Sequence, residues 1–388
     1  MNLLILPSWY DTPNNQIRGI FFKEQAQSLS SYFKKNNINV KITILALQQY
    51  NIKELNIYKG IKKISVSNED GITTIRARLF HIPKVNELNF RRGAYYLKKL
   101  IKYTEKKTDQ KFDLIHIHSF QYCGIWYVLS GLNIPYVITE HSSSFFRNTI
   151  NNKEKKYLPL VYDNAKDVIA VGNGLANKIQ KYSQKKVKVI FNQVKDVASL
   201  NFKLIEKTEN FIFFSLGYDI KVKGFDILLN AFAKFLKKET GSLIIGGLTD
   251  ANQEILKKQI ELLGIKNNVI LKGRIPHNEV YKIMNESNCF VLPSRYETFG
   301  IVLAESMYVG RPVIATKTGG PDSFVTKKTG ILIEPDNEEQ LVNALLDMKN
   351  NYSLFKQSDI RKYALETFTA DVICDKIYNI YITIFEND

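Results

Sequence analysis

The chain has 388 residues, of which 45% are hydrophobic and 24% charged, so it can form two globular domains and is too apolar for wholesale disorder. No apolar run approaches the ~18 residues that cross a bilayer, and the apolar start lacks the basic region and cleavage site of a signal peptide. Three scattered cysteines, Cys123, Cys289 and Cys374, argue against a disulfide framework or a zinc site and fit a reducing cytoplasm.

The net charge of +16 is unevenly placed along the chain. Residues 1–200 carry 31 Lys and Arg against 14 Asp and Glu, whereas the remaining residues carry 23 against 24. This asymmetry suggests an anionic partner for the first half: anionic lipid, a phosphorylated carrier or nucleic acid. Generic surface lysines without any partner are the open alternative.

In the first half, short apolar runs alternate with segments of helical period. This alternation predicts a parallel sheet covered on both faces. The strands are predicted at Leu3–Leu6, Val40–Leu47, Ile72–Arg78, Leu114–Ile117, Tyr136–Thr139, Val168–Ala170 and Val187–Ile190, and the helices at Ile20–Lys35, Phe90–Lys107 and Gly124–Ser130.

The same alternation restarts in the second half. We therefore predict an α/β fold of two Rossmann-like, doubly wound domains that face each other across a cleft, with ligands at the carboxyl ends of the strands. The domains cover 1–200 and 201–370, with a junction near Lys195–Lys207, and a helix in 371–388 packs back on the first domain. The strands are predicted at Phe211–Leu216, Ser242–Ile245, Val269–Lys272, Cys289–Leu292 and Val313–Ala315, and the helices at Phe225–Lys237, Asn252–Leu263, His277–Asn285, Phe299–Tyr308, Glu338–Lys349 and Asp371–Phe385.

The segment from Pro293 to Ser306 is the strongest chemical signal. It predicts a strand end, a loop that carries Glu297, and a helix that begins near Phe299 and contains Glu305. The free N–H groups of the first helical turn, on Phe299, Gly300 and Ile301, form an anion site, and Gly300 allows a ligand to approach the backbone closely. The two carboxylates suit hydroxyl groups: Glu297 for a transferred sugar and Glu305 for a ribose. A loop or capping residue and a solvated helix residue are the plainer alternatives.

Glu297 and Glu305, with Phe-Gly between them and a Pro-Ser strand end before them, resemble the retaining glycosyltransferases of family 4, which have the GT-B fold of two Rossmann-like domains. The resemblance covers nearly the whole chain. It extends to Gly217 through Asp226, Gly273 through Pro276, Gly319 through Asp322, and Thr329 through Leu332, of which the last two resemble later Gly-rich loops of the family. In the first half the loop at Arg18-Gly19, the pair His116 and His118, and Thr139-Glu140-His141 also fit.

The resemblance implies a donor site for a nucleotide-diphosphate sugar in the second domain, with UDP favoured over GDP. Lys223 would place a cation on the diphosphate, and Gly273, Arg274 and Ile275 would form the base-binding turn. The family has an Arg where this chain has Tyr218, so a bidentate cation is missing and Lys221 is a possible substitute. Gly19 would bring backbone N–H groups to the diphosphate from the first domain.

His141 would contact the donor sugar and align the reaction, by the same resemblance, and Ser142, Ser143 and Arg147 are candidate acceptor-side groups. His116 and His118 are both interpreted as structural. Because they alternate at a strand end, we expect only one of them to face the cleft.

The predicted helix Phe90–Lys107 interleaves basic residues with tyrosines. This pattern suits docking on an anionic bilayer, as in relatives that act on lipid-linked acceptors, and an ordinary sheet-covering helix with a solvated basic face is the alternative. We therefore predict a cytoplasmic protein that is peripheral on the inner face of the cell membrane. The proposed membrane residues are Arg91, Arg92, Lys98, Lys99 and Lys102.

No Asp-x-Asp triplet occurs in the chain, so we expect no metal or other cofactor. Lys223, the helix N-terminus and loop amides would stabilise the leaving diphosphate. The predicted reaction moves a hexose or N-acetylhexosamine to a saccharide acceptor in surface polysaccharide synthesis, and we expect this acceptor to be lipid-linked. Two other classes remain open: a non-catalytic sugar-nucleotide-binding protein, because of Tyr218, and a basic nucleic-acid-binding protein, which lacks any helix-turn-helix, RRM or zinc pattern.

Overall fold

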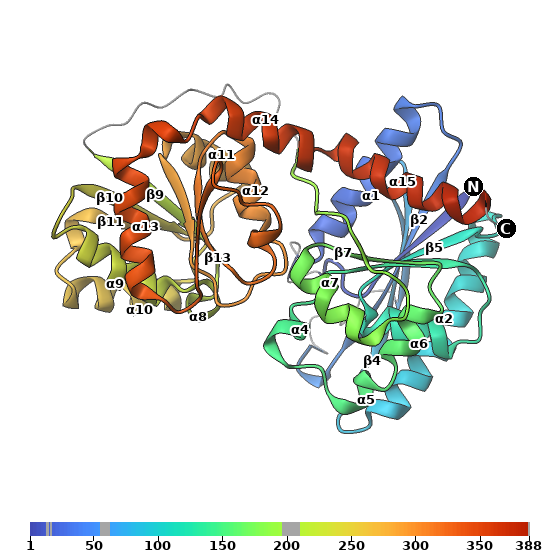
Figure 1. Cartoon of the computed structure of the whole chain (residues 1–388). Helices are drawn as coiled ribbons and strands as arrows, with labels where there is room; N and C mark the ends of the chain where they lie inside the picture. The colour runs from blue at the N-terminus through green and yellow to red at the C-terminus, as the bar shows by residue number, and fades with distance from the viewer. Residues whose placement is uncertain (13–14, 16–17, 55–62, 196–209, 387–388) are drawn as a thin grey trace. The chain divides into compact units, whose positions relative to one another are not determined.

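A computed structural model describes all residues except 13–14, 16–17, 55–62, 196–209 and 387–388 (Figure 1). The chain divides into two compact units. Unit 1 comprises residues 1–171, 175–190 and 370–388, and unit 2 comprises residues 172–174 and 191–369. The predicted junction near 195–207, including the boundary at 200, lies almost entirely outside the described residues.

The described strands of unit 1 form an eight-stranded sheet in the order β3-β4-β2-β1-β5-β6-β7-β8. Its central strands are buried on both faces, as their unbroken apolar runs predict. The strands are β1 (Asn2–Pro7), β2 (Lys41–Tyr50), β3 (Ile64–Glu69), β4 (Ile72–Phe80), β5 (Leu114–His118), β6 (Tyr136–Glu140), β7 (Asp167–Ala170) and β8 (Lys188–Val189). Associated with this sheet are α1 (Ile20–Lys35), α2 (Asn86–Thr108), η2 (Phe120–Gly124), α3 (Ile125–Leu129), α4 (Ser144–Arg147), α5 (Asn152–Lys155), α6 (Leu158–Asp163), α7 (Asn173–Ile179), η3 (Gln180–Tyr182) and α15 (Ala370–Glu386).

Unit 2 is built on a six-stranded parallel sheet in the order β11-β10-β9-β12-β13-β14. The strands are β9 (Phe211–Leu216), β10 (Gly241–Gly246), β11 (Val269–Leu271), β12 (Cys289–Leu292), β13 (Val313–Thr316) and β14 (Gly330–Ile333). The helices are α8 (Ile220–Lys223), α9 (Phe225–Phe235), α10 (Asp250–Leu262), η4 (Lys266–Asn268), α11 (His277–Glu286), α12 (Ile301–Tyr308), η5 (Pro321–Ser323), α13 (Glu338–Asn350), η6 (Tyr352–Leu354) and α14 (Gln357–Phe368). Two doubly wound sheets confirm the predicted fold class.

Two strands depart from the sequence-based expectation. β3 was not predicted, and it pairs antiparallel with β4 at the edge of an otherwise parallel sheet. Its residues alternate between exposed and half-buried, and its apolar residues Ile64 and Val66 are exposed, so it lacks the buried apolar run of a central parallel strand. β14 contains Gly330, Ile331 and Leu332, which the sequence assigned to a Gly-rich loop; they pair in parallel with β13 instead. β14 is a four-residue strand at the edge of the sheet, and so short a run gives too weak a periodic signal to be recognised as a strand.

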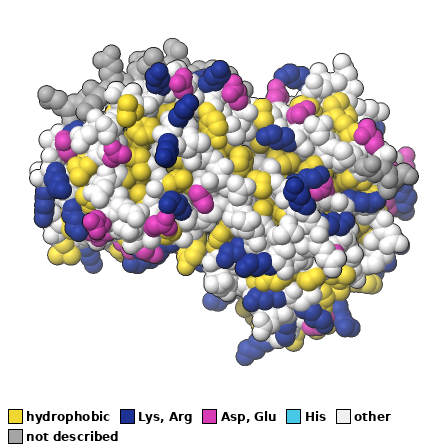
Figure 2. All heavy atoms as spheres, viewed as in Figure 1, with side chains coloured by type: hydrophobic (Ala, Val, Ile, Leu, Met, Phe, Trp, Pro, Cys, Tyr) yellow, Lys and Arg dark blue, Asp and Glu magenta, His cyan; other side chains and the backbone are white. Residues whose placement is uncertain are grey.

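Basic side chains are spread over the visible face of unit 1, on the right of Figure 2. Across the described residues, no helix is long and apolar enough to cross a membrane.

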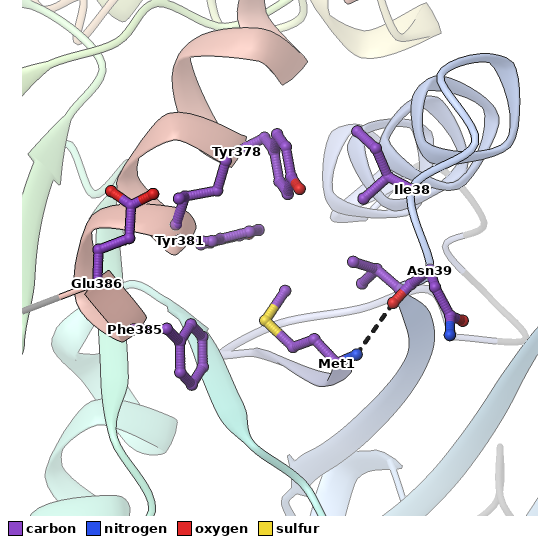
Figure 3. Close-up of a pocket in the computed structure, with 9 residues that line it drawn as sticks. Met1, Ile38, Asn39, Tyr378, Tyr381, Phe385 and Glu386 are labelled. Atoms are coloured by element: carbon purple, nitrogen blue, oxygen red, sulfur yellow. Dashed lines mark hydrogen bonds between the residues drawn. The ribbon is translucent and has the colours of Figure 1, made fainter. Parts of the chain in front are cut away.

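The C-terminal helix α15 packs back on unit 1, as predicted. Tyr378 of α15 lies against Phe33 of α1 with ring centroids 5.4 Å apart, and the Tyr32 hydroxyl donates to Asp375 at 2.8 Å. Tyr378, Tyr381 and Phe385 also point from α15 toward Met1 and Ile38, where they line a pocket of about 290 Å³ (Figure 3).

The strongest tie between α15 and the sheet is buried. The Tyr381 hydroxyl lies 2.5 Å from Nδ1 of His116 on β5, and His116 Nε2 lies 2.7 Å from Oγ1 of Thr139 on β6. Burial lowers the pKa of His116 to about 3, so the ring is neutral in the folded protein at neutral pH. The unfolded chain takes up a proton near the ordinary histidine pKa of ~6.5.

This difference predicts acid-sensitive stability. Because the folded pKa of His116 is depressed, its contribution is present above pH ~6.5 and is lost as the pH falls toward 3. Between pH 7 and pH 5 one such histidine costs about 2 kcal/mol of unfolding free energy. His116→Gln should shrink the loss of stability between these pH values by that amount in urea denaturation. An undiminished loss in His116→Gln would contradict this assignment.

Candidate functional site

The loop after β12 and the start of α12 position Glu297. Gly300 precedes the first residue of α12 with φ 89°, a conformation that favours glycine. A Cβ atom there would approach Cγ of Glu297 to 3.2 Å, so the loop folds tightly over the helix start. A Cβ on Gly320 would lie 2.7 Å from Glu297 O and Phe299 N, which shows that the Gly319-Gly320 loop lies directly against the Glu297 loop. Helix α12 begins at Ile301, two residues later than predicted.

Lys223 at the end of α8 meets Glu297. Its Nζ lies 2.7 Å from Glu297 Oε2, and both side chains are largely buried, with 18% and 14% of their surface exposed. The stem of Lys223 crosses Gly217, where a Cβ would lie only 2.6 Å from Lys223 Cγ. A backbone bond from Arg295 N to Val222 O, at 2.9 Å, joins the two loops. The structure thus brings the predicted cation and the first predicted carboxylate together.

Glu305 lies further along α12 and is buried. Its Oε1 lies 2.8 Å from His277 Nε2 and 3.3 Å from the Tyr281 hydroxyl, both on α11. The sequence interpretation missed His277 and Tyr281. The signal that could have found His277 is its position directly after the Gly273–Pro276 turn, at the start of a helix. These contacts orient the Glu305 carboxylate and make α11 part of the candidate donor site.

The other predicted donor residues differ in burial and in the contacts that their side chains and backbone make. The Cδ1 atom of Ile275 lies so close to Gly246 that a Cβ atom on Gly246 would be only 2.4 Å from it. The predicted base-binding turn therefore packs on the end of β10. Arg274 is exposed. The Phe299 ring is buried and stacks against Phe191 at 5.6 Å, so only its backbone can face a ligand. Gly273 accepts a backbone bond from Gly247 N at 3.0 Å.

Tyr218 stands where the resemblance places an arginine, and its side chain is 72% exposed. The suggested substitute, Lys221, lies 2.6 Å from Asp226 Oδ2. Arg295 also contacts this carboxylate, at 2.9 Å. Burial by itself raises the pKa of Asp226, but the bonds from Arg295 and Lys221 outweigh it and lower the pKa. Lys221 is therefore paired with Asp226, and the lysine that lies beside Glu297 is Lys223.

In unit 1, Gly19 precedes α1 with φ 68°. A Cβ there would lie 2.6 Å from the carbonyl oxygen of Trp9, in the loop that follows β1, so the position requires glycine. The backbone at Gly19 thus lies at the carboxyl end of β1, the edge of a parallel sheet where ligands bind.

His141 follows β6 and is buried, with Nε2 3.2 Å from His118 Nδ1 on β5. The rings of His116 and His118 stack at 4.3 Å. The expectation that only one of these two histidines faces the site side was wrong, because residues two apart on a strand point to the same face. Burial lowers the pKa of His141 to about 3, so its ring is neutral.

Glu140, directly before His141, is fully buried and accepts four hydrogen bonds. Its donors are the N–H groups of Phe120, His141 and Ser142 and the Tyr162 hydroxyl. Burial raises the pKa of Glu140, and these bonds lower it in part. The sequence interpretation assigned no role to this carboxylate, which joins the loops after β5 and β6.

The candidate acceptor-side residues are placed differently from one another. Ser142 is buried, and its hydroxyl contacts Ser144 Oγ at 2.9 Å. Ser143 is half-buried and Arg147, at the end of α4, is exposed. In the described part of the chain, no three His, Cys, Asp or Glu side chains are grouped as a metal site would require. Independence from metal ions stays a prediction.

Comparison with known proteins identifies the family on both halves of the chain. Residues 196–367 match the model of "Glycosyl transferases group 1", and residues 53–196 match that of "Glycosyltransferase Family 4". An uncharacterized glycosyltransferase of Methanocaldococcus jannaschii is 31% identical over 71% of this chain and 75% of its own. The O-antigen chain mannosyltransferase C of Escherichia coli is 26% identical over 83% and 86%. A Campylobacter jejuni N-acetylgalactosaminyltransferase, named for a diphospho-undecaprenol substrate, is 29% identical over 56% and 60%.

Solved structures agree on the fold. Sucrose-phosphate synthase from Thermosynechococcus elongatus has a TM-score of 0.77 at 18% identity, over the whole of both chains. The Anabaena protein HepE, solved with UDP and glucose, has a TM-score of 0.69 at 18% identity, over 99% of this chain and all of its own. The two Rossmann-like units agree with these matches. The chain belongs to the family 4 glycosyltransferases of the GT-B fold and is a transferase enzyme.

Proposed function

We propose that this enzyme moves a hexose or N-acetylhexosamine from a UDP- or GDP-sugar to a saccharide acceptor, with retention of the anomeric configuration and without a metal ion. The observation that carries the proposal is the contact between Lys223 Nζ and Glu297 Oε2 at the mouth of α12. A cation, a helix N-terminus and a carboxylate then share one small region, which matches the diphosphate and the hydroxyls of a sugar nucleotide.

In the proposed reaction, the bond between the anomeric carbon and the β-phosphate oxygen breaks, and its electron pair leaves with the diphosphate. Lys223 and the N–H groups at the start of α12 stabilise that charge. The acceptor oxygen attacks the anomeric carbon on the same face and passes its proton to the departing phosphate oxygen. Glu297 accepts hydrogen bonds from the transferred sugar, and Glu305, oriented by His277, accepts them from the ribose.

UDP is the favoured donor nucleotide because the structural neighbour HepE was solved with UDP. The base would rest on the Gly273–Ile275 turn, and Gly19 and His141 would contact the diphosphate and the transferred sugar. The names of the Escherichia coli and Campylobacter jejuni relatives support an acceptor in surface glycan synthesis, carried on a lipid diphosphate. Ser142, Ser143 and Arg147 are the proposed acceptor-side residues.

Variants of the ion pair test the donor site. Lys223→Ala and Glu297→Ala should each lower kcat/KM for donor consumption by ~10²–10³, because each removes a charge that acts in the transition state. The measurement is nucleotide release from a panel of UDP- and GDP-sugars. Lys257→Ala, in an exposed ion pair on α10, is the matched control and should keep wild-type rates.

The same assay tests the second candidate function, a non-catalytic sugar-nucleotide sensor. That candidate is suggested by the exposed Tyr218, which stands where the family has an arginine. For an enzyme, the wild type should release nucleotide and Glu297→Ala should show the ~10²–10³ loss given above, while isothermal titration still detects binding of UDP to the variant. Binding of UDP-sugars by the wild type without any turnover, even with a saccharide acceptor present, would favour the sensor.

We further propose that unit 1 docks on an anionic membrane through the outer face of α2. Tyr95 and Tyr103 are exposed there, together with Arg91, Lys99 and Lys102, and Lys99 lies 4.4 Å from the centre of the Tyr95 ring. Arg92 and Lys98 are half-buried, and Arg92 Nη1 donates to the Phe80 carbonyl at 3.3 Å, so these two contribute less than the sequence suggested. This placement supports a cytoplasmic, peripheral enzyme.

Charge reversal tests the membrane proposal. Arg91→Glu, Lys99→Glu and Lys102→Glu together should weaken binding to phosphatidylserine vesicles by at least ~100-fold, since each basic residue near the surface contributes about 1 kcal/mol. Co-sedimentation at low and high salt measures it. The matched control reverses three exposed lysines of unit 2, Lys257, Lys258 and Lys282, and should bind as the wild type does. An equal loss of vesicle binding in both triple variants would show that net charge, and not the outer face of α2, causes the effect.

A further inference from the structure

A chain of buried contacts runs from the C-terminal helix to His141. Tyr381 of α15 contacts His116, His116 stacks on His118, and His118 contacts His141. All three histidines are buried, and none of them is used for a metal cluster among the described residues. The proposed function uses only His141, so the purpose of a second histidine bonded directly to it is unexplained.

His141 is confined on several sides. Its ring packs against Phe21 and Phe22 of α1, each at a centroid distance of 5.1 Å. One of its nitrogens, Nε2, is occupied by His118. The other, Nδ1, is buried and has no hydrogen-bond partner among the residues that the structure describes. An unpaired buried nitrogen is costly, so Nδ1 is the atom of this ring that is left for a ligand.

His118 is itself held in place. Its ring lies between Phe22, at 4.7 Å, and His116, at 4.3 Å with an interplanar angle of 22°. His116 cannot turn, because both of its nitrogens have partners, in Thr139 and Tyr381. The position of His118 Nδ1 is therefore set by the β5 strand and by α15 together.

We propose that His118 is a positioning residue for His141: its Nδ1 binds Nε2 of His141 and thereby fixes the ring orientation and the nitrogen that carries the proton at the transferred sugar. A single proton lies between Nδ1 of His118 and Nε2 of His141, because two neutral imidazoles form one hydrogen bond. The protonation of the ligand-facing Nδ1 is then coupled to His118. The proposal rests on the proposed function, in which His141 contacts the sugar.

Amide replacements separate positioning from packing. Asn places its amide where Nδ1 of His118 lies, Gln reaches toward the position of Nε2, and Phe keeps a ring without any polar atom. We expect His118→Phe and His118→Gln to lower kcat by ~10- to 100-fold with the donor KM little changed, and His118→Asn to recover most of the rate. Thermal melts confirm that each variant is folded.

A double-mutant cycle gives the decisive kinetic result. If His118 acts only through His141, His118→Phe should cost nothing more in a His141→Ala background. Losses that add, or a wild-type kcat in His118→Phe, would overturn the proposal. Normal loss of turnover in Lys223→Ala beside an unaffected His118→Phe would leave the proposed function standing and remove only this inference.

A spectroscopic measurement tests the same contact without turnover. With ¹⁵N-labelled histidine, the wild type should show His141 in one neutral tautomer, assigned by the peak lost in His141→Gln. His118→Phe, which has no polar atom to bind Nε2 of His141, should give a mixture of the two tautomers. A mixture already present in the wild type, or one tautomer in all variants, would contradict the positioning role even if no donor sugar were found.

Discussion

The contact between Lys223 and Glu297 is the interaction on which the arrangement of the candidate donor site in unit 2 depends. It joins residues that are 74 positions apart, Lys223 at the end of α8 and Glu297 in the loop after β12. The strands that precede them, β9 and β12, lie side by side in the sheet. Each neighbour of the pair is adapted to it. Gly217 leaves space for the lysine stem, and Gly300 and Gly320 let the glutamate loop fold against α12. A larger residue at any of these three positions would push the two charges apart.

Without a ligand, the pair also solves an electrostatic problem. Both groups are more than four-fifths buried, and a lone charge in such a place is costly to desolvate. A sugar diphosphate would give Lys223 a second anion, while the sugar hydroxyls would give Glu297 new donors. The ion pair thus offsets the cost of burying each charge, and under the proposed function both side chains stand where a sugar diphosphate would meet them.

Unit 1 is organised around a different principle, the exclusion of water from a polar cluster. His116, His118, His141 and Glu140 are all buried, and the carboxylate of Glu140 accepts bonds from both loops that flank the histidines. Burial keeps the pKa of all three histidines low, so the cluster has no internal charge repulsion at neutral pH. The C-terminal helix closes this cluster through Tyr381, which explains why a segment from the end of the chain belongs to the first unit.

The sequence by itself determined the fold class, the order of most strands and helices, and the candidate residues Glu297, Glu305 and Lys223. Hydrophobic period and short loop motifs are local, so they can be read along the chain. It missed the edge strand β3 and the strand β14, whose short or polar runs carry little periodic signal.

Only the tertiary structure decided which of these residues meet. The pairing of Lys223 with Glu297, of His277 with Glu305 and of His118 with His141 joins distant segments, and no local pattern encodes such contacts. It also showed that Tyr218 is exposed and that Lys221 is held by Asp226. Which side chains meet depends on the order of the strands in the sheet. That order results from the packing of the whole unit, because the hydrophobic effect depends on the apolar surface that is buried and not on which residues are adjacent in the sequence.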